Sequence, residues 1–194
     1  MKRILLIVDP QNDFITGTLL VKGAKEKMMK LADYIISGAH PQYDYICVTM
    51  DSHPEDHCSF KENGGIWPKH CVIYTNGWNI PEYLDDSLMH FSNWSGKSVM
   101  YYHKGTEADQ EEYSIFDSED GNTLSEQITK LIQEYGVCID ICGIAGDYCV
   151  LETLKGLRRI IGDQYIQVLT QYTTSIDGGD KLRDYIKEND LNYE

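Results

Sequence analysis

Five continuous apolar runs constrain most strongly how this chain can fold. Uninterrupted runs of this length are typical of strands that are buried on both faces of a parallel sheet. The runs are Arg3–Val8, Tyr45–Met50, Val99–His103, Cys138–Ile144 and Tyr165–Thr170. Stretches with helical spacing separate them or follow the last one: Ala24–Ser37, Leu124–Tyr135, Cys149–Ile161 and Lys181–Glu188. Strands that alternate with helices predict right-handed crossovers, and therefore an α/β fold with a mostly parallel sheet and helices on both faces.

Two other segments carry weaker structural signals. Cys71–Tyr74 is a candidate for a short sixth strand. The segment from Glu55 to Asn93 is rich in Gly, Asn, Trp and Pro and lacks a clear period. We interpret it as a long loop, since such segments tend to be binding loops or lids. The length of 194 residues, without a linker or an internal repeat, favours a single domain over residues 1–194.

The charge of the chain excludes several classes of partner. It has 17 basic and 31 acidic residues and a net charge of −14, which repels nucleic acid and anionic membrane surfaces. No apolar run reaches the roughly 20 residues of a membrane-spanning helix, and the first run ends on Asp9, too early for a signal peptide. We therefore expect a cytoplasmic protein. The six cysteines show no CxxC spacing, so a disulfide framework is the weaker interpretation.

Chemically reactive side chains follow four of the predicted strands. Asp9 follows the first strand, Asp51 the second and Lys104 the third, and the segment from Ala145 to Cys149 follows the fourth. Ligands of open parallel sheets bind outside the carboxyl ends of the strands. We therefore expect these groups to share one rim, although they are scattered over 140 positions of the sequence.

Cys149 opens a predicted helix after a glycine-containing turn. Unpaired backbone N–H groups at a helix start favour a thiolate and could also hold an oxyanion. The alternative is that Cys149 is only a buried apolar residue beside Tyr148 and Val150. A neighbouring Lys104 would lower the thiol pKa, and a buried Asp9 could carry a proton from the thiol to a leaving amine. By themselves, however, these two residues can equally be a solvated lysine and a turn-capping aspartate.

A second group of residues combines one carboxylate with imidazoles from two neighbouring loops. Asp51 and His53 lie on the same side of an extended segment, and His70 comes from the next loop. Three ligands of this type leave positions open for water or substrate, as in a catalytic metal site. His57 is close enough to be a fourth ligand or an outer partner of the ion. The alternative is a capped turn before Pro54.

Three aromatic residues lie close in sequence to these groups. Phe14, Trp67 and Tyr113 could clamp a flat ring, although aromatic residues in such places are more often part of the core.

Four motifs together resemble the nicotinamidases, over roughly residues 3 to 157. The first and the last are shared across the wider isochorismatase-like superfamily, whereas the two between them are narrower and indicate the nicotinamidase branch. The motifs are Asp9-Pro10-Gln11-Asn12-Asp13-Phe14, Asp51-Ser52-His53-Pro54, Trp67-Pro68-Lys69-His70-Cys71-Val72 and Gly143-Ile144-Ala145-Gly146-Asp147-Tyr148-Cys149-Val150.

This resemblance implies a fold and an activity. The fold is a three-layer α/β/α sandwich around a six-stranded sheet. The activity is hydrolysis of nicotinamide to nicotinate and ammonia through a thioester, in NAD salvage. Cys149 would be the nucleophile, Lys104 and Asp9 would complete a triad, and the backbone N–H groups of Ala145 and Cys149 would form the oxyanion hole. The peptide bond between Ile144 and Ala145 would be cis.

The resemblance also implies a cofactor. One divalent ion would be held by Asp51, His53 and His70; zinc is the usual ion, with iron or manganese as alternatives. The pyridine nitrogen of nicotinamide would bind this ion. Relatives are often homo-oligomers, so we keep this assembly open for the present chain.

Two departures from the family pattern and three rival functions remain. Ile15-Thr16-Gly17 replaces a Pro-Gly-Gly, and Ile115 replaces a glycine; we expect both to flank the pocket. The nearest rival is another amidohydrolase of the superfamily that acts on a carbamoyl, ureido or other small amide, which is not expected to need the three metal ligands together. A thiol-based oxidant sensor and a simple zinc-binding protein are the other two.

Overall fold

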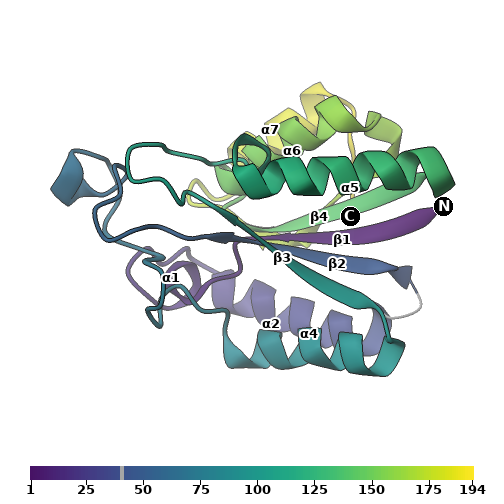
Figure 1. Ribbon diagram of the computed structural model, residues 1–194, viewed down its shortest axis with the longest axis horizontal. Coiled ribbons are helices and arrows are strands. Elements are labelled where there is room, and N and C mark those ends of the chain that lie inside the picture. The colour runs from purple at the N-terminus through teal and green to yellow at the C-terminus, as the bar shows by residue number, and fades with distance from the viewer. Residues whose placement is uncertain (40–41) are drawn as a thin grey trace.

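Six parallel strands form one sheet in the order β3-β2-β1-β4-β5-β6. The computed structural model describes residues 1–39 and 42–194 (Figure 1). The strands are β1 (Lys2–Val8), β2 (Tyr45–Asp51), β3 (Ser98–Lys104), β4 (Val137–Ile144), β5 (Ile166–Thr174) and β6 (Asn192–Tyr193).

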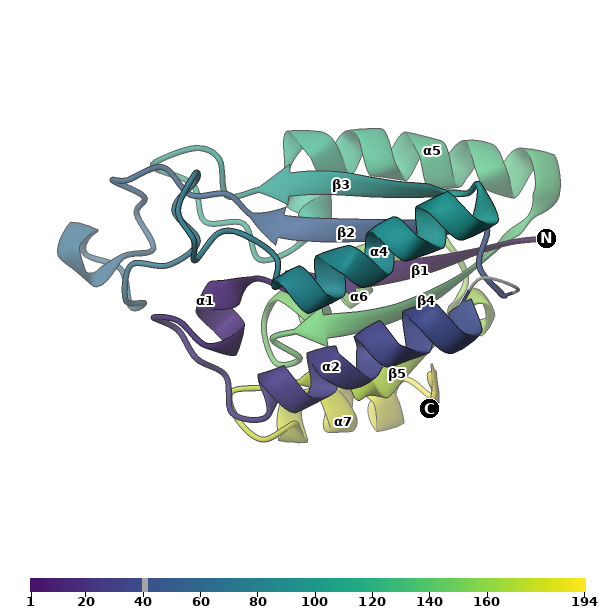
Figure 2. The ribbon, with the colours of Figure 1, turned by 90° about the horizontal axis from the view of Figure 1, so that it is seen from below.

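Helices cover both faces of this sheet. The α-helices are α1 (Asn12–Ile15), α2 (Ala24–Tyr34), α4 (Glu82–Ser95), α5 (Glu119–Tyr135), α6 (Cys149–Ile160) and α7 (Asp180–Glu188). The short helices are η1 (Ile35–Ala39), η2 (Lys61–Asn63), η3 (Ile115–Asp117) and η4 (Asp163–Tyr165). Helices α2 and α4 lie side by side on one face, and α5, α6 and α7 lie on the other (Figures 1 and 2). The three-layer α/β/α sandwich predicted from the sequence is thus confirmed, with a sheet that is parallel throughout.

Each central strand supplies two hydrophobic cores, which explains its uninterrupted apolar sequence. In β1, Leu5 and Ile7 pack into the core under α2 and α4. The alternate residues Ile4 and Leu6 pack into the core under α5, α6 and α7. All four are buried, and burying one such side chain contributes about 1.5–3 kcal/mol to folding.

The prediction of a sixth strand at Cys71–Tyr74 is wrong. The sixth strand is β6, near the end of the chain, and the 71–74 segment makes only one isolated bridge, from Val72 to His53. The backbone φ angles of Cys71 and Tyr74 are 48° and 66°, which no extended strand contains.

The long loop expected from Glu55 to Asn93 is also partly wrong, because α4 occupies its last third. The buried face of this helix is built from Leu84, Leu88 and Phe91, whose spacing of four and three residues is helical. The residues before α4 form loops beyond the carboxyl ends of the strands (Figure 1). All six cysteines are free. Within residues 1–39 and 42–194, no helix is long and apolar enough to cross a membrane.

Candidate functional site

The strand order brings the carboxyl ends of β1, β2, β3 and β4 next to one another. Asp9 directly follows β1, Asp51 and Lys104 end β2 and β3 as register partners, and Cys149 begins α6 after β4. All four side chains are buried. The shared rim expected from the sequence is therefore present.

Lys104 lies at the centre of this group. Its Nζ is 3.0 Å from Asp9 Oδ2 and 3.6 Å from Cys149 Sγ, and it donates a short hydrogen bond to Asp51 Oδ1. Asp9 is fixed by a second contact, since Thr49 Oγ1 donates to its Oδ1 at 2.6 Å. The three residues predicted as a triad are thus within contact distance around one ammonium group.

Burial and the mutual charges set the protonation of this group. Burial disfavours the ammonium of Lys104, but the carboxylates of Asp51 and Asp9 more than offset this and hold its pKa well above the ordinary value. Burial likewise raises the pKa of the Cys149 thiol, and Lys104 opposes that shift only in part. The expectation that Lys104 lowers the thiol pKa therefore has the correct direction, but burial and the two carboxylates outweigh it.

The turn before α6 leaves two backbone donors free. The peptide bond between Ile144 and Ala145 is cis, as expected. Tyr148 N and Val150 N both donate to Ala145 O. Among the described residues, however, the N–H groups of Ala145 and Cys149 donate to no backbone or side-chain acceptor. Both residues line the cavity described below, so these donors are suited to hold a developing negative charge.

The predicted metal ligands also come together. One ligand atom from each of Asp51, His53 and His70 lies within 4.8 Å of the other two. The Nε2 atoms of His53 and His70 are 3.6 and 3.9 Å from Asp51 Oδ2. All three side chains are buried, which keeps the cluster out of bulk solvent.

The outer contacts of the two imidazoles fit a bound ion. His53 Nδ1 is 2.9 Å from Gly105 O, and His70 Nδ1 is 2.8 Å from Pro68 O. Since a carbonyl can only accept, each Nδ1 carries the proton and each Nε2 keeps its lone pair for a metal. One carboxylate oxygen and two imidazole nitrogens form a donor set that suits zinc and similar divalent ions.

His57 is a packing partner of this site. Its ring stacks on His53 with centroids 4.0 Å apart. Its Nδ1 lies 2.8 Å from Ser59 Oγ and its Nε2 lies 2.9 Å from Gln110 O, so neither nitrogen is available to an ion. Of the two roles considered for His57, the outer partner is the one that fits.

A narrow cavity connects the thiol to the metal ligands. Its walls include all three aromatic residues singled out in the sequence, Phe14, Trp67 and Tyr113. Trp67 Nε1 donates to Tyr113 OH at 3.0 Å, which orients both rings. The remaining residues along the cavity are Leu19, Val21, Asp51, His70, Glu111, Ala145, Tyr148, Cys149 and Ile176.

Several functional contacts escaped the sequence analysis. Gln11 was noted only as part of a motif, but its side chain clamps the main chain of Asp51: Nε2 donates to Asp51 O at 2.7 Å, and Oε1 accepts from Asp51 N at 2.8 Å. Glu111 lines the cavity, yet no sequence pattern set it apart from other acidic residues, and Tyr148, which also lines it, was noted only as part of the fourth motif.

The two departures from the family pattern do not line the cavity, but Ile15 directly follows Phe14 and Ile115 lies two residues after Tyr113, both of which do line it. Ile15 is buried in the core under α2 and α4, and Ile115 is buried in the core on the other face of the sheet. Neither is among the described residues that line the cavity. Their side chains fill core space, which explains why apolar residues are tolerated there.

Comparison with known proteins agrees with this geometry. No protein-family model matches the chain. The chain is 34% identical over 162 residues to the nicotinamidase/pyrazinamidase of Mycobacterium tuberculosis, covering 81% of this chain and 79% of the relative. The zinc complex of the pyrazinamidase of Pyrococcus horikoshii superposes with a TM-score of 0.76 and 28% identity, covering 100% of this chain and 99% of that chain.

A third similar structure is PnC1 from L. infantum in complex with nicotinate, with a TM-score of 0.80 and 25% identity, covering 100% of this chain and 92% of that one. The identity to the mycobacterial protein and the coverage of most of its length show the family. The chain belongs to the nicotinamidase/pyrazinamidase family.

Proposed function

We propose that this protein hydrolyses nicotinamide to nicotinate and ammonia, with Cys149 as the nucleophile. The observation that carries the proposal is the cavity that joins the Cys149 thiol to Asp51 and His70. An aromatic amide bound there would face both groups. The nicotinamidase relatives and the nicotinate complex of a similar protein support this choice of substrate.

In the first half of the reaction, Cys149 Sγ attacks the carboxamide carbon and its proton passes to Asp9. One ligand atom from each of Cys149 and Asp9 lies within 4.8 Å of the other, and burial raises the pKa of Asp9, which favours proton uptake. The ammonium of Lys104 contacts both groups and balances the negative charge that moves between them. The free N–H groups of Ala145 and Cys149 would hold the oxyanion.

In the second half, Asp9 gives this proton to the departing amide nitrogen, which leaves as ammonia, and the carbonyl carbon stays on Cys149 as a thioester. A water molecule, deprotonated by Asp9, then adds to the thioester carbon. As the C–S bond breaks, Asp9 returns the proton to the sulfur, and the product leaves as nicotinate after its carboxyl proton passes to solvent.

Asp51, His53 and His70 would hold the divalent ion, for which we propose zinc. Their donor set is of the zinc type, and a similar pyrazinamidase binds zinc. When bound, the ion supplies a Lewis-acidic site that can coordinate the pyridine nitrogen. Phe14, Trp67 and Tyr113 would enclose the ring from the other sides, as their positions along the cavity suggest.

The rival amidohydrolase of carbamoyl or ureido amides is not favoured, because it does not explain three metal ligands beside the thiol. The same cluster argues against a protein that only senses oxidants. A simple zinc-binding protein leaves the contacts of Lys104 with Asp9 and Cys149 without a purpose.

Ammonia release from nicotinamide by the purified protein tests the proposal. Cys149→Ala should reduce turnover by about 10⁶-fold, as removal of a triad nucleophile does elsewhere, while one ion per chain stays bound. Cys58→Ala is the matched control, because Cys58 is a half-buried cysteine outside the cavity. Retained turnover in Cys149→Ala would refute the nucleophile, and release from ureido amides but not from nicotinamide would refute the substrate.

A further inference from the structure

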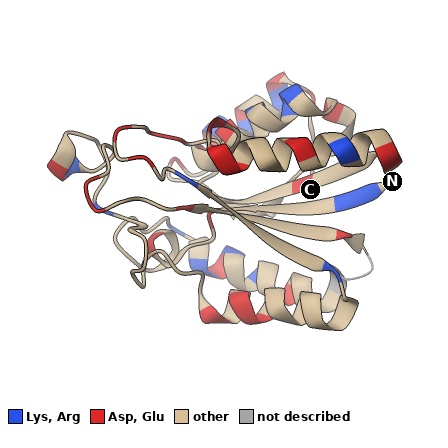
Figure 3. Ribbon diagram, viewed as in Figure 1, with Lys and Arg blue, Asp and Glu red and all other residues tan. Residues whose placement is uncertain are grey.

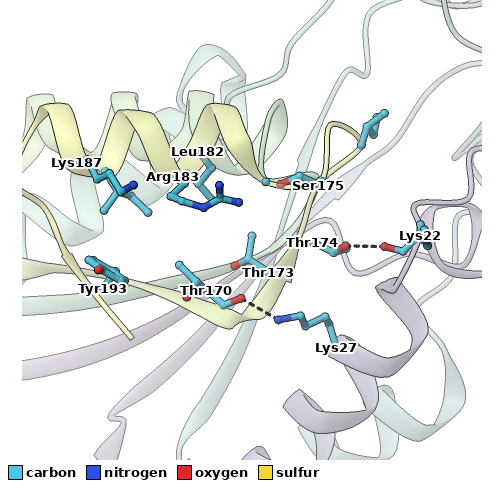
Figure 4. Close-up of a pocket in the computed structure, with 14 residues that line it drawn as sticks. Lys22, Lys27, Thr170, Thr173, Thr174, Ser175, Leu182, Arg183, Lys187 and Tyr193 are labelled. Atoms are coloured by element: carbon cyan, nitrogen blue, oxygen red, sulfur yellow. Dashed lines mark hydrogen bonds between the residues drawn. The ribbon is translucent and has the colours of Figure 1, made fainter.

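A groove that is separate from the catalytic cavity lies along β5, between α2 and α7. It has a volume of about 450 Å³, within the roughly 300–1,000 Å³ range of small-molecule sites. Figure 4 shows Arg183 and Lys187 of α7 on one side of it and Lys27 of α2 on the other, with Lys22 at one end. We call it the basic groove and define it by these four residues.

The charge of the basic groove is opposite to that of the protein as a whole. Acidic residues outnumber basic ones by 31 to 17 in the chain, and they are spread over loops and helices on both faces of the sheet (Figure 3). Yet the basic groove is lined by four cationic side chains and, among the described residues, by no acidic one. Like charges around one hollow repel each other unless an anion occupies it, and of these four cations only Arg183 forms an ion pair with a described residue, Asp180.

These cationic groups have unused hydrogen-bond donors. No described residue accepts a hydrogen bond from the ammonium of Lys22 or of Lys187. Lys27 donates only to Thr170 O, at 3.1 Å, and Arg183 donates through Nη1 to Asp180, at 2.8 Å. An ammonium has three N–H donors and a guanidinium has five, so the groove can offer a phosphate group several charge-assisted hydrogen bonds.

The backbone N–H groups at the start of α7 are not the source of anion recognition in this groove. Two backbone donors there are already taken by Asp177, whose carboxylate accepts from Gly179 N at 2.7 Å and from Lys181 N at 2.8 Å. Recognition therefore depends on the side chains. The wall between the cations carries the apolar side chains of Leu182, Ile186 and Tyr193 beside Thr170 and Thr173, and its apolar part can accommodate the organic part of a ligand.

We propose that the basic groove binds a small phosphate monoester of about mononucleotide size, with its phosphate held by Lys22, Lys27 and Arg183 and its organic part against Leu182 and Tyr193. The net charge of −14 disfavours long polyanions such as nucleic acid. This binding does not depend on the proposed reaction.

The basic groove shares a wall with the catalytic cavity. Ile176 lines both. The carboxylate of Asp147, two residues before Cys149, accepts hydrogen bonds from Ile176 N at 2.9 Å and Asp177 N at 3.0 Å. An occupant of the groove would therefore contact a segment that is hydrogen-bonded to the turn carrying the thiol.

Calorimetric titration at low ionic strength tests the proposal, with AMP, adenosine and inorganic phosphate as probes. We expect AMP to bind, adenosine not to bind, and inorganic phosphate to bind more weakly than AMP. Raising the salt concentration should weaken AMP binding. Binding of adenosine as tight as that of AMP, or no binding of AMP, would overturn the proposal. Equal binding of phosphate and AMP would overturn the role of the apolar wall.

Paired variants locate the site. Lys22→Gln with Arg183→Gln removes the exposed cation at one end of the basic groove and one exposed cation on its α7 side, and should weaken AMP binding about tenfold or more. Lys61→Gln with Lys130→Gln is the matched control, because these exposed lysines lie outside the groove. It should leave the affinity within about twofold. Equal affinity of the two double variants would show that the anion binds elsewhere and refute the assignment.

Discussion

Replacement of Lys104 by methionine should destabilise the protein by several kcal/mol, because it removes the cation between two buried carboxylates. The Lys104 side chain is fully buried and contacts both Asp9 and Asp51. Without it, one oxygen of Asp9 and one of Asp51 lie within 4.8 Å of each other with no ammonium to neutralise them. At an effective dielectric constant of about 20, two unit charges at this distance repel by about 3.5 kcal/mol. This value agrees with the roughly 3–5 kcal/mol that follow from breaking a buried ion pair.

The loss should depend on pH in a defined direction. In the wild type, burial acts to raise the pKa of Asp51, but Lys104 and His53 hold it below its ordinary value. In Lys104→Met, the folded-state pKa of Asp9, which burial already raises in the wild type, rises further, and that of Asp51 rises above its value in the unfolded chain. A carboxyl group whose pKa is higher in the folded than in the unfolded chain destabilises the fold at pH values above its folded pKa. This destabilisation is lost as the pH falls and the group takes up a proton. The difference between variant and wild type should therefore shrink from pH 7 towards pH 4.5.

Urea unfolding in the presence of chelator measures this difference at both pH values. Lys30→Met is the control, since Lys30 pairs with Glu26 on the surface, and it should cost less than about 1 kcal/mol. Adding Asp9→Asn to Lys104→Met should restore part of the stability without restoring ammonia release. A loss below about 1 kcal/mol at pH 7, or an equal loss at pH 7 and pH 4.5, would refute the charge balance assigned to Lys104.

Three further substitutions test other parts of the site. Gly105→Ala would place a Cβ 2.4 Å from the His53 ring, at a backbone φ of +63°. It should lower the metal affinity, measured in competition with a chelating dye, about 10–100-fold. An unchanged affinity would contradict the role of Gly105 O in orienting His53. His57→Phe should still bind one ion per chain by elemental analysis, and loss of the ion would make His57 a ligand. Tyr113→Phe leaves Trp67 Nε1 without its acceptor and should raise KM for nicotinamide about fivefold, equivalent to about 1 kcal/mol; an unchanged KM would remove the Trp67–Tyr113 pair from ring binding.

The central sheet could be predicted from the sequence because its strands are buried on both faces. A run such as Ile4 to Val8 has to be apolar throughout, since its alternate side chains enter two different cores. Strand β6 has two exposed residues and carries no such signal. Helix α4 was missed because its apolar residues follow a loop rich in Gly and Pro, which masked the helical period.

The candidate site was predictable where its residues directly follow strands or lie within compact motifs. Asp9, Asp51 and Lys104 were found in this way, because parallel strands end at one edge of the sheet. Gln11 was not, since it acts through the main chain of a residue 40 positions away. The basic groove was also missed, because Lys22 and Lys187 are brought together only by the fold.

The most direct test of the account is mass spectrometry of the peptide that contains Cys149, after acid quenching during turnover of nicotinamide. We expect a nicotinoyl group bound to the Cys149 sulfur, which disappears when the substrate is exhausted and is absent from Cys149→Ala. Ammonia release that continues with no acyl group on Cys149, and at the same rate in Cys149→Ala, would contradict it.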